Sequence, residues 1–526
     1  MLFNSYGFIF LFLPAALGLF FGIARGRPRA AAGLLVGASL FFYGWWNPVY
    51  LVLLAGSILF NYAVGAGLGH ARLRGQAMRA KWLLRLGVGG DLALLGYFKY
   101  AHFFLASLRP LVPALAHAGT IVLPLGISFF TFTQIAFLVD VYQGKAKEYN
   151  FLHYALFVTY FPHLIAGPIL HHSEMMPQFA QAKTYRVDHE NLAVGLTMFA
   201  IGLFKKAVLA DGIGAHAIPI FRAGAEGHPL TFFGAWAGAL SYTFQLYFDF
   251  SGYSDMAIGL SRLFNITLPL NFNSPYKAAN IIDFWRRWHM TLSRFLRDYL
   301  YIPLGGNRRG KIRRYVNLMV TMLLGGLWHG AGWTFVVWGG LHGVYLAINH
   351  AWRAGRQALG KDPSGTTPLG RGLAWALTFL AVVAAWVFFR MPTFQGAVDM
   401  LSGMAGLNGI SIPEALAAHL GSLAPVAQQM GIKVDLGGGA DFLATYAWIA
   451  ALFAIAVWAP NSQELVAAYA PALGFGRAAS HEVGQSGWTR RLRFQLSRRW
   501  AFATALCTAC GILSLNHVTQ FLYFQF

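Results

Sequence analysis

Residues 315–350 read YVNLMVTMLLGGLWHGAGWTFVVWGGLHGVYLAINH, two apolar runs that meet at a histidine among glycines. The runs cover 315–328 and 333–350, and His329 lies at the junction. Each run approaches the ~20 residues that a helix needs to cross a bilayer. Glycine permits a helix break or close backbone approach, so we expect His329 to face a cavity between two membrane helices. A hydrogen-bonded core histidine would give the same local pattern.

The composition of the whole chain is that of a membrane protein. Its 526 residues are 57% hydrophobic and 11% charged, and the mean hydropathy is +0.50. Soluble domains are roughly 25% charged, so a bilayer must cover this apolar surface. The net charge of +21 does not indicate nucleic-acid binding, because the basic residues form short clusters between apolar runs.

Further apolar segments predict an all-α integral membrane protein of about 11 to 13 spans, a single polytopic domain over 1–526. We expect N-terminal spans in 1–110, a catalytic core in 120–350, and C-terminal spans with loops in 351–526. Pro and Gly interrupt segments 120–142 and 151–170, and region 244–300 reads as short or tilted helices around a water-accessible interior. The clear spans are 3–24, 30–47, 50–70, 84–106, 192–213, 230–249, 315–328, 333–350, 371–390, 442–459 and 501–521.

Charge bias predicts the orientation of these spans. Basic clusters at Arg25–Arg29, Arg72–Arg85, Arg286–Arg314, Arg353–Arg371 and Arg477–Arg499 are expected in the cytoplasm. The acidic stretch Pro392–Asp441 is expected outside. Both termini are then extracytoplasmic, and the aromatic end FLYFQF suits the outer interface.

A second histidine lies in a basic segment, WRRWHMTLSRFLRDYL, which reads as one helix. On such a helix Arg286, His289, Ser293 and Arg297 share a face, and Arg287 and Arg294 form a neighbouring stripe. A basic stripe beside a histidine suits an anionic, phosphate-bearing donor. A juxtamembrane helix whose arginines meet lipid phosphates would look the same.

Ionisable and hydroxyl side chains inside apolar sequence are functional candidates because burying them is costly. We select Asp249, Ser251, Asp255 and Ser293 as tunnel-lining candidates, together with Trp328 beside His329. The chain contains no G-x-S-x-G or Walker A segment, so serine hydrolysis and direct ATP use are not indicated. No H-x-x-x-H with a following carboxylate indicates a metal site, and the pair His171–His172 is isolated, so we predict no metal site.

These motifs resemble the membrane-bound O-acyltransferase (MBOAT) family, in particular its bacterial alginate and cellulose O-acetylation subunits. The resemblance rests on LPLGISFFTFTQIAFLVDVY, YFPHLIAGPIL, YFDFSGYSDMAIGLSRLFNITLPLNFNSPY, DFWRRWHMTLSRFLRDYLYIPLGGNRRG, GLWHGAGWTFVVWGGLHG, WVFFRMPTF and FLYFQF. It implies a ring of helices around a central region where a cytoplasmic tunnel meets an extracytoplasmic funnel. It also implies that His329 is catalytic and that His289 is the second family histidine.

The resemblance implies an acetyltransferase of the bacterial inner membrane with acetyl-CoA as donor and no bound cofactor. His329 would act as general base, and His289 would orient the thioester or polarise its carbonyl. The expected partners are the lipid bilayer, an exopolysaccharide such as alginate or cellulose, and an extracytoplasmic acetyl-acceptor protein. D-alanyl transfer of the teichoic-acid type and a membrane carrier or flippase are the alternatives, and a structural scaffold is a third.

Overall fold

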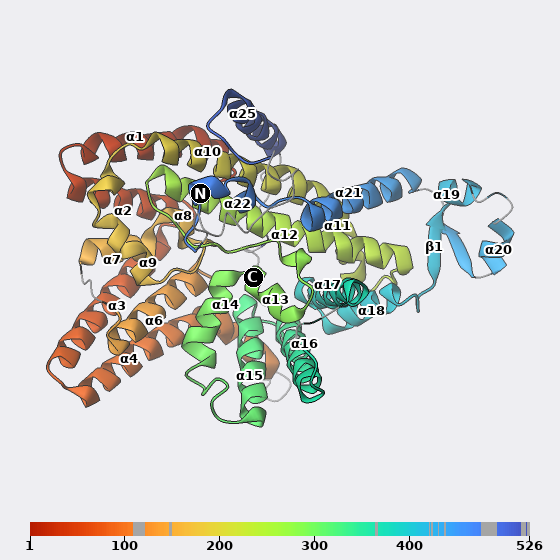
Figure 1. Cartoon of the computed structure of the whole chain (residues 1–526), viewed down its shortest axis with the longest axis horizontal. Helices are drawn as coiled ribbons and strands as arrows, with labels where there is room; N and C mark the ends of the chain where they lie inside the picture. The colour runs from red at the N-terminus through yellow and green to blue at the C-terminus, as the bar shows by residue number, and fades with distance from the viewer. Residues whose placement is uncertain are drawn as a thin grey trace.

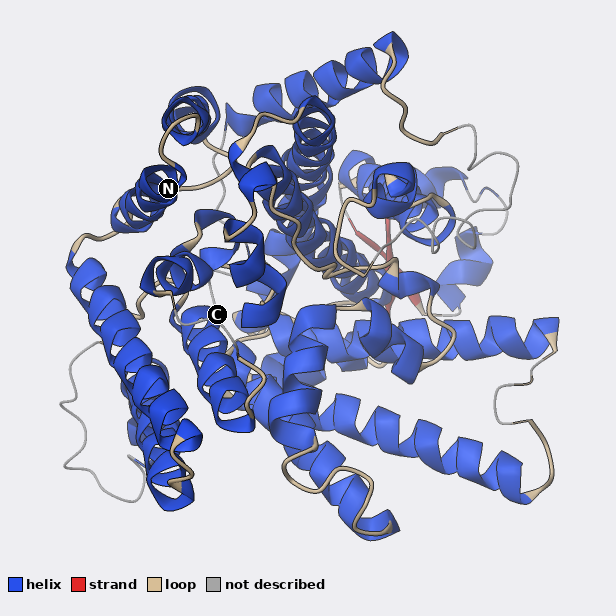
Figure 2. Ribbon diagram, turned by 60° about the vertical axis from the view of Figure 1, so that its left-hand side comes forward, coloured by secondary structure: helices blue, strands red, loops and turns tan. Residues whose placement is uncertain are grey.

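The computed structural model describes residues 1–108, 121–146, 150–362, 365, 367–419, 421, 424–429, 431–435, 438–474, 492–516 and 522. These residues are helical almost throughout, which confirms the predicted all-α class (Figure 2). A small parallel sheet pairs β1 (Ile410–Pro413) with β2 (Ile432–Asp435). Apart from Leu522, the aromatic end 521–526 lies outside the described residues, as does much of the basic segment 477–499.

The N-terminal third is helical in its described residues, with short turns between the helices of residues 13–95. Pro28 begins α2, where its missing N–H costs no intrahelical hydrogen bond. The antiparallel pair α3 and α4 packs against α6 and extends away from the rest of the molecule (Figure 1). The elements are η1 (Phe8–Phe12), α1 (Leu13–Ala24), α2 (Pro28–Gly44), α3 (Val49–Leu73), α4 (Ala77–Leu95), η2 (Gly96–Tyr100), α5 (Ala101–Leu108) and α6 (Ile127–Gln143).

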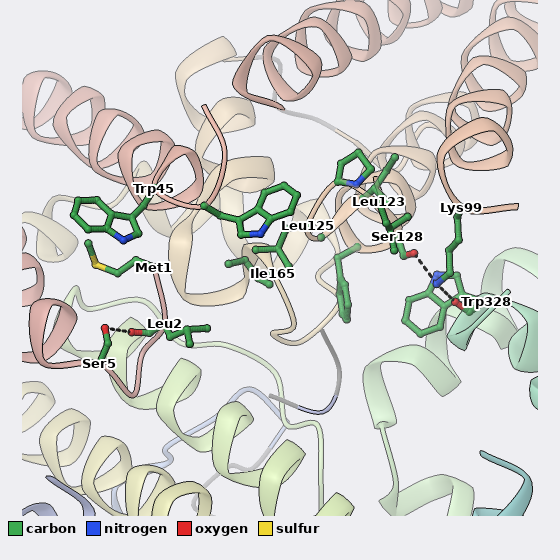
Figure 3. A pocket seen from close by; sticks show the side chains of 15 residues that line it. Met1, Leu2, Ser5, Trp45, Lys99, Leu123, Leu125, Ser128, Ile165 and Trp328 are labelled. Carbon is green, nitrogen blue, oxygen red and sulfur yellow. Dashed lines mark hydrogen bonds between the residues drawn. The ribbon is translucent and has the colours of Figure 1, made fainter. Parts of the chain in front are cut away.

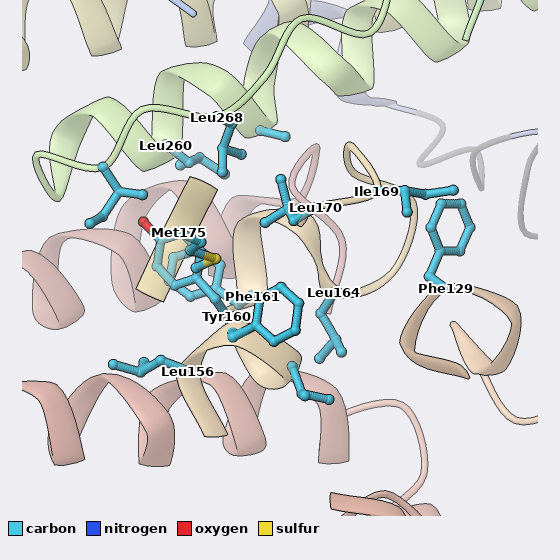
Figure 4. Packing of buried hydrophobic residues seen from close by; sticks show 14 of the residues in the cluster. Phe129, Leu156, Tyr160, Phe161, Leu164, Ile169, Leu170, Met175, Leu260 and Leu268 are labelled. Atoms are coloured by element: carbon cyan, nitrogen blue, oxygen red, sulfur yellow. The ribbon is translucent and has the colours of Figure 1, made fainter. Parts of the chain in front are cut away.

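The segment after α6 is broken, as its Pro and Gly residues predict. Helix α7 ends at Thr159, and a short α8 with Pro162 in its first turn follows. Aromatic and aliphatic side chains of this segment belong to one buried cluster with residues of α12, among them Phe161 and Leu260 (Figure 4). The elements are α7 (Phe151–Thr159), α8 (Phe161–Leu164), α9 (His172–Phe179), η4 (Ala182–Tyr185), α10 (His189–Phe204), η5 (Lys205–Ala210), α11 (Asp211–Ala225) and α12 (Phe232–Leu263).

Helix α12 crosses the middle of the molecule and is buried along most of its length (Figure 1). Its backbone approaches α10 closely, because a Cβ at Gly202 would lie 2.6 Å from the carbonyl oxygen of Gly252. Small residues permit such contacts between membrane helices. The prediction of short helices over 244–300 is wrong for the first part of this region, where one helix continues to Leu263. Beyond it, Ile281–Arg287 and Met290–Leu296 are short helices, as predicted.

Helices α13 to α16 follow α12 and hold both candidate histidines. Helices α15 and α16 form an antiparallel hairpin in which a Cβ at Gly326 would lie 3.1 Å from Gly339 Cα. The elements are η6 (Pro275–Lys277), α13 (Ile281–Arg287), α14 (Met290–Leu296), η7 (Arg297–Tyr301), α15 (Lys311–His329) and α16 (Trp333–Ala358).

The C-terminal third returns along α12 and carries the small sheet at one end of the molecule (Figure 1). Thr367 caps α17 by accepting from Gly370 N. The elements are α17 (Pro368–Arg390), α18 (Phe394–Met404), α19 (Glu414–His419), α20 (Ala424–Gln429), α21 (Gly439–Trp458), α22 (Ser462–Leu465), η9 (Ala467–Tyr469), α25 (Arg498–Leu513) and η10 (Ser514–Asn516).

Four helical stretches of the described residues are long and apolar enough to cross a membrane: Val49–Leu73, His189–Ala225, Pro368–Arg390 and Gly439–Trp458. The protein is therefore an integral membrane protein by composition and by helix length. The total of 11 to 13 spans stays a prediction.

Candidate functional site

His329 is the last residue of α15. The helix ends there because Gly330 adopts an extended conformation, with φ −158° and ψ 146°. The imidazole is 5% exposed and has aromatic neighbours, with its ring centroid 5.0 Å from that of Trp338 and 5.3 Å from that of Phe389. The glycine-flanked break predicted from the sequence is confirmed, and the hairpin partner α16 supplies part of the wall around the ring.

His289 lies at a break between α13 and α14, which corrects the reading of this segment as one helix. Its φ of 43° and ψ of 53° are left-handed, a conformation that a histidine seldom adopts. The side chain is fully buried, and its ring centroid is 6.1 Å from that of His329. The two histidines therefore come together, although 40 positions separate them in the sequence numbering.

Asn271 orients His289, and the sequence reasoning did not find it. Its Oδ1 lies 3.1 Å from His289 Nδ1 and accepts from the Thr291 hydroxyl at 2.9 Å. Its amide nitrogen donates to Ser254 Oγ at 3.2 Å. Because Oδ1 can only accept, Nδ1 carries the proton and Nε2 is the basic nitrogen of the neutral ring. A role in which neutral His289 donates to a carbonyl through Nε2 is thus disfavoured.

Lys99 is a second site residue that the sequence reasoning missed. Its Nζ donates to the carbonyl oxygens of Trp328 at 2.5 Å and of His329 at 3.4 Å, and to Ser128 Oγ at 3.2 Å. A lysine within the predicted span 84–106 was itself a signal, because an ionisable residue at membrane depth is costly. Figure 3 shows Lys99 reaching across to Ser128 and Trp328.

A third histidine, His342, lies one helical turn beyond Trp338 on α16. It is fully buried, and Trp285 Nε1 donates to its Nδ1 at 3.3 Å. Two further turns along the same face, Leu346 and His350 reach a cavity. This face of α16 thus runs from Trp338, whose ring contacts His329, toward that cavity.

Two hollows lie near the histidine pair. The first, which we call the tryptophan hollow, measures about 480 Å³ (Figure 3). The second, the arginine hollow, measures about 590 Å³. The tryptophan hollow is lined by Met1, Leu2, Ser5, Trp45, Trp46, Lys99, 123–129, Ile165 and Trp328. The arginine hollow is lined by Glu174, Pro269, Leu270, Ile282, Trp285, Arg286, Met290, Thr291, Ser293, Arg294, Arg297, Leu346, His350, Leu473 and Gly474.

The hollows lie toward opposite ends of the helices. Trp46, which lines the tryptophan hollow, precedes α3, whereas Arg72 lies in the last turn of that helix. The tryptophan hollow is therefore remote from the basic cluster Arg72–Arg85. Leu346 and His350 lie in the second half of α16, toward its basic C-terminal end. Trp328 and Met290, the sequence neighbours of the two histidines, line the hollows, whereas neither imidazole lines either of them. The expectation that His329 faces a cavity therefore stays a prediction.

The predicted donor-binding arginines separate into two groups. Arg286, Arg294 and Arg297 line the arginine hollow together with Ser293. Arg294 pairs with Glu174 at 2.5 Å, and Arg297 pairs with Asp298 at 2.7 Å.

Arg287 lies apart from this group. It is not among the residues of that hollow, and it bonds Asp283 at 2.9 Å and the carbonyl oxygen of Asn273. The structure therefore brings three of the four arginines to one cavity.

Of the predicted tunnel-lining residues, Trp328 and Ser293 line a hollow, and the others lie elsewhere. Asp249 pairs with Lys206 at 2.7 Å, and Asp255 pairs with Lys205 at 2.6 Å, both across α12 and η5. Ser251 is buried within α12, and neither hollow includes it. These two aspartates balance lysines that would otherwise be buried charges.

Asp255→Asn is expected to destabilise the protein rather than slow its chemistry. It leaves Lys205 inside the helix packing without its carboxylate partner, and breaking a buried pair costs about 3–5 kcal/mol. Thermal melting in detergent should drop, and the double variant Lys205→Met/Asp255→Asn should recover much of the loss. A selective fall in turnover at unchanged melting temperature would instead make Asp255 a functional residue.

Comparison with known proteins adds an independent finding. The model of the MBOAT, membrane-bound O-acyltransferase family, matches residues 98–389. A peptidoglycan O-acetyltransferase of Helicobacter pylori is 48% identical over 439 residues, covering 78% of this chain and 81% of that protein. The probable alginate O-acetylase AlgI of Pseudomonas aeruginosa is 40% identical over 562 residues, covering 100% of both chains. A teichoic acid D-alanyltransferase of Streptococcus thermophilus is 29% identical over 310 residues, covering 55% of this chain and 74% of that protein.

Proposed function

The chain belongs to the membrane-bound O-acyltransferase family, and on that premise we propose that it moves acetyl groups from cytoplasmic acetyl-CoA to an exported polysaccharide. One observation carries the proposal: two buried histidines lie together, and their sequence neighbours Trp328 and Met290 line hollows toward opposite ends of the α15–α16 hairpin. A transferase that joins substrates from two compartments needs a reactive group between two such entrances. The location is the bacterial inner membrane, with both chain termini outside.

The donor would enter through the arginine hollow, where cations suit the phosphates of coenzyme A. The acceptor hydroxyl would enter through the tryptophan hollow. His329 removes the hydroxyl proton, the alkoxide attacks the thioester carbonyl, and the tetrahedral intermediate expels the thiolate, which takes the proton from His329. His289 presents Nε2 as an acceptor, which suits orienting the hydroxyl or sharing its proton. No metal or bound cofactor takes part in this scheme.

Transfer by purified protein in sealed vesicles tests the proposal. Labelled acetyl-CoA is supplied on the arginine-hollow side and an oligosaccharide on the other, and labelled ester is measured. Ester formation that depends on His329 supports the enzyme. Flux of an intact substrate without covalent change would support a carrier instead. Incorporation of D-alanine in place of acetyl would support the teichoic-acid type of transfer.

The identity of the acceptor polymer has two candidates, each favoured by a relative. Full-length similarity to the probable alginate O-acetylase favours an alginate-like exopolysaccharide. The higher identity to a peptidoglycan O-acetyltransferase favours the glycan strands of the cell wall. Ester analysis of both polymers from cells with and without the protein decides between them. An extracytoplasmic protein that relays the acetyl group would appear in the same cells as a labelled intermediate.

Arg286→Ala is expected to raise the KM for acetyl-CoA about tenfold while kcat stays nearly constant. Its guanidinium lines the arginine hollow, and a charge-assisted contact to phosphate is worth about 1.5–3 kcal/mol. Steady-state kinetics on reconstituted protein measure the change. Arg287→Ala is the matched control, because the Arg287 side chain pairs with Asp283 and does not line the hollow. Equal effects of the two substitutions would contradict donor binding in this hollow.

A further inference from the structure

The C-terminal end of α15 is held by side chains from a remote part of the chain. A helix end leaves its last carbonyl groups without intrahelical partners, and buried carbonyls need donors. Lys99 Nζ supplies them to Trp328 and His329, and Tyr100 donates its hydroxyl to the carbonyl oxygen of Leu327 at 3.0 Å. Three consecutive carbonyls that end at the candidate base are therefore fixed from η2.

The Lys99 ammonium interacts with this helix end. Its side chain is 8% exposed, and none of the ion pairs among the described residues includes it. The C-terminus of a helix carries a partial negative charge of about half an electron, so a cation there is stabilised without a carboxylate. Ser128, at the start of α6, accepts the remaining hydrogen bond and holds the ammonium from a second element.

We propose that Lys99 is the positioning residue for His329, clamping the last carbonyls of α15 so that the imidazole keeps its place beside His289 and Trp338. The proposal rests on the proposed function, in which His329 is the general base. Lys99 also lines the tryptophan hollow, so it couples the acceptor entrance to the orientation of the base. Misplacing a catalytic group by about 1 Å can cost ~100-fold in rate.

The test uses full-length protein in vesicles with acetyl-CoA and an oligosaccharide acceptor. Lys99→Met, which keeps the chain length and removes the donors, should lower kcat about 10- to 100-fold and leave the KM for acetyl-CoA unchanged. Tyr100→Phe should lower kcat by less, because it frees one carbonyl only. Lys81→Met is the control, since it removes an exposed lysine from the preceding helix α4. Activity of Lys99→Met equal to wild type overturns the proposal.

Chemical rescue separates positioning from a general structural role. Lys99→Ala opens space beside the tryptophan hollow, and added ethylammonium should restore part of the turnover saturably, while propanol should not. A variant that stays folded, loses turnover and shows no amine rescue contradicts the clamp.

Ser128→Ala decides the matter if the lysine variants do not fold. It removes one hydrogen bond of the Lys99 ammonium and should lower kcat roughly three- to tenfold. An unchanged kcat overturns the proposal. Wild-type protein that shows no transfer dependent on His329 would refute the proposed function itself, a result distinct from either of these.

Discussion

Replacing His329 by alanine is expected to abolish acetyl transfer, with a fall in kcat of at least about 10³-fold. The substitution removes the group proposed to take the proton from the acceptor hydroxyl. Alanine is compatible with the last turn of α15, and the clamp on its carbonyls involves backbone atoms that the variant keeps. The variant should therefore insert and melt like wild type, and transfer of labelled acetyl in vesicles measures the loss.

The matched control for this variant is His163→Ala. His163 is also buried, at 3% exposure, but it lies on α8, whereas His329 ends α15 beside His289. Its replacement should lower the melting temperature and spare turnover per folded molecule. Retained acetylation in the His329→Ala variant would remove this residue from the mechanism. Equal losses of turnover in both variants would point to a structural effect.

Replacing His289 by asparagine is expected to lower kcat about 10²-fold. Asparagine tolerates the left-handed backbone at this position better than most residues, so the variant isolates the imidazole from backbone strain. The residual activity should exceed that of His329→Ala, because His329 keeps its proposed role as base. Kinetics at saturating acetyl-CoA and acceptor give the comparison.

Asn271→Ala tests the orientation of His289 separately. It removes the acceptor that fixes the proton on Nδ1, so turnover should fall about tenfold while both histidines remain. Asn265→Ala is a suitable control, since the Asn265 amide donates to the backbone carbonyl oxygens of Lys183, Thr184 and Arg186. Wild-type turnover in the His289→Asn variant would mean that His289 serves only in packing.

Much of the fold and the identity of the histidine pair were predictable from the sequence. Apolar runs of membrane length predicted where the long helices lie, because a bilayer imposes both a length and a composition on any helix that crosses it. Several of these helices end well away from the predicted residues, as α12 and α16 do. Glycines around His329 predicted the helix break correctly. The family resemblance supplied His289 and the class of reaction. For α12 the pattern misled us, because polar residues that read as a water-filled interior instead pair within the helix packing.

What the sequence determined by itself is thus the membrane setting, the positions of the long apolar helices and the helix break at His329. The tertiary structure alone decided which atoms serve the two histidines. Lys99 and Trp328 meet across 229 residues, and Asn271 reaches His289 only because the chain breaks between α13 and α14. Local periodicity records which face of a helix is apolar, whereas a hydrogen bond between distant elements depends on how complete helices pack against one another.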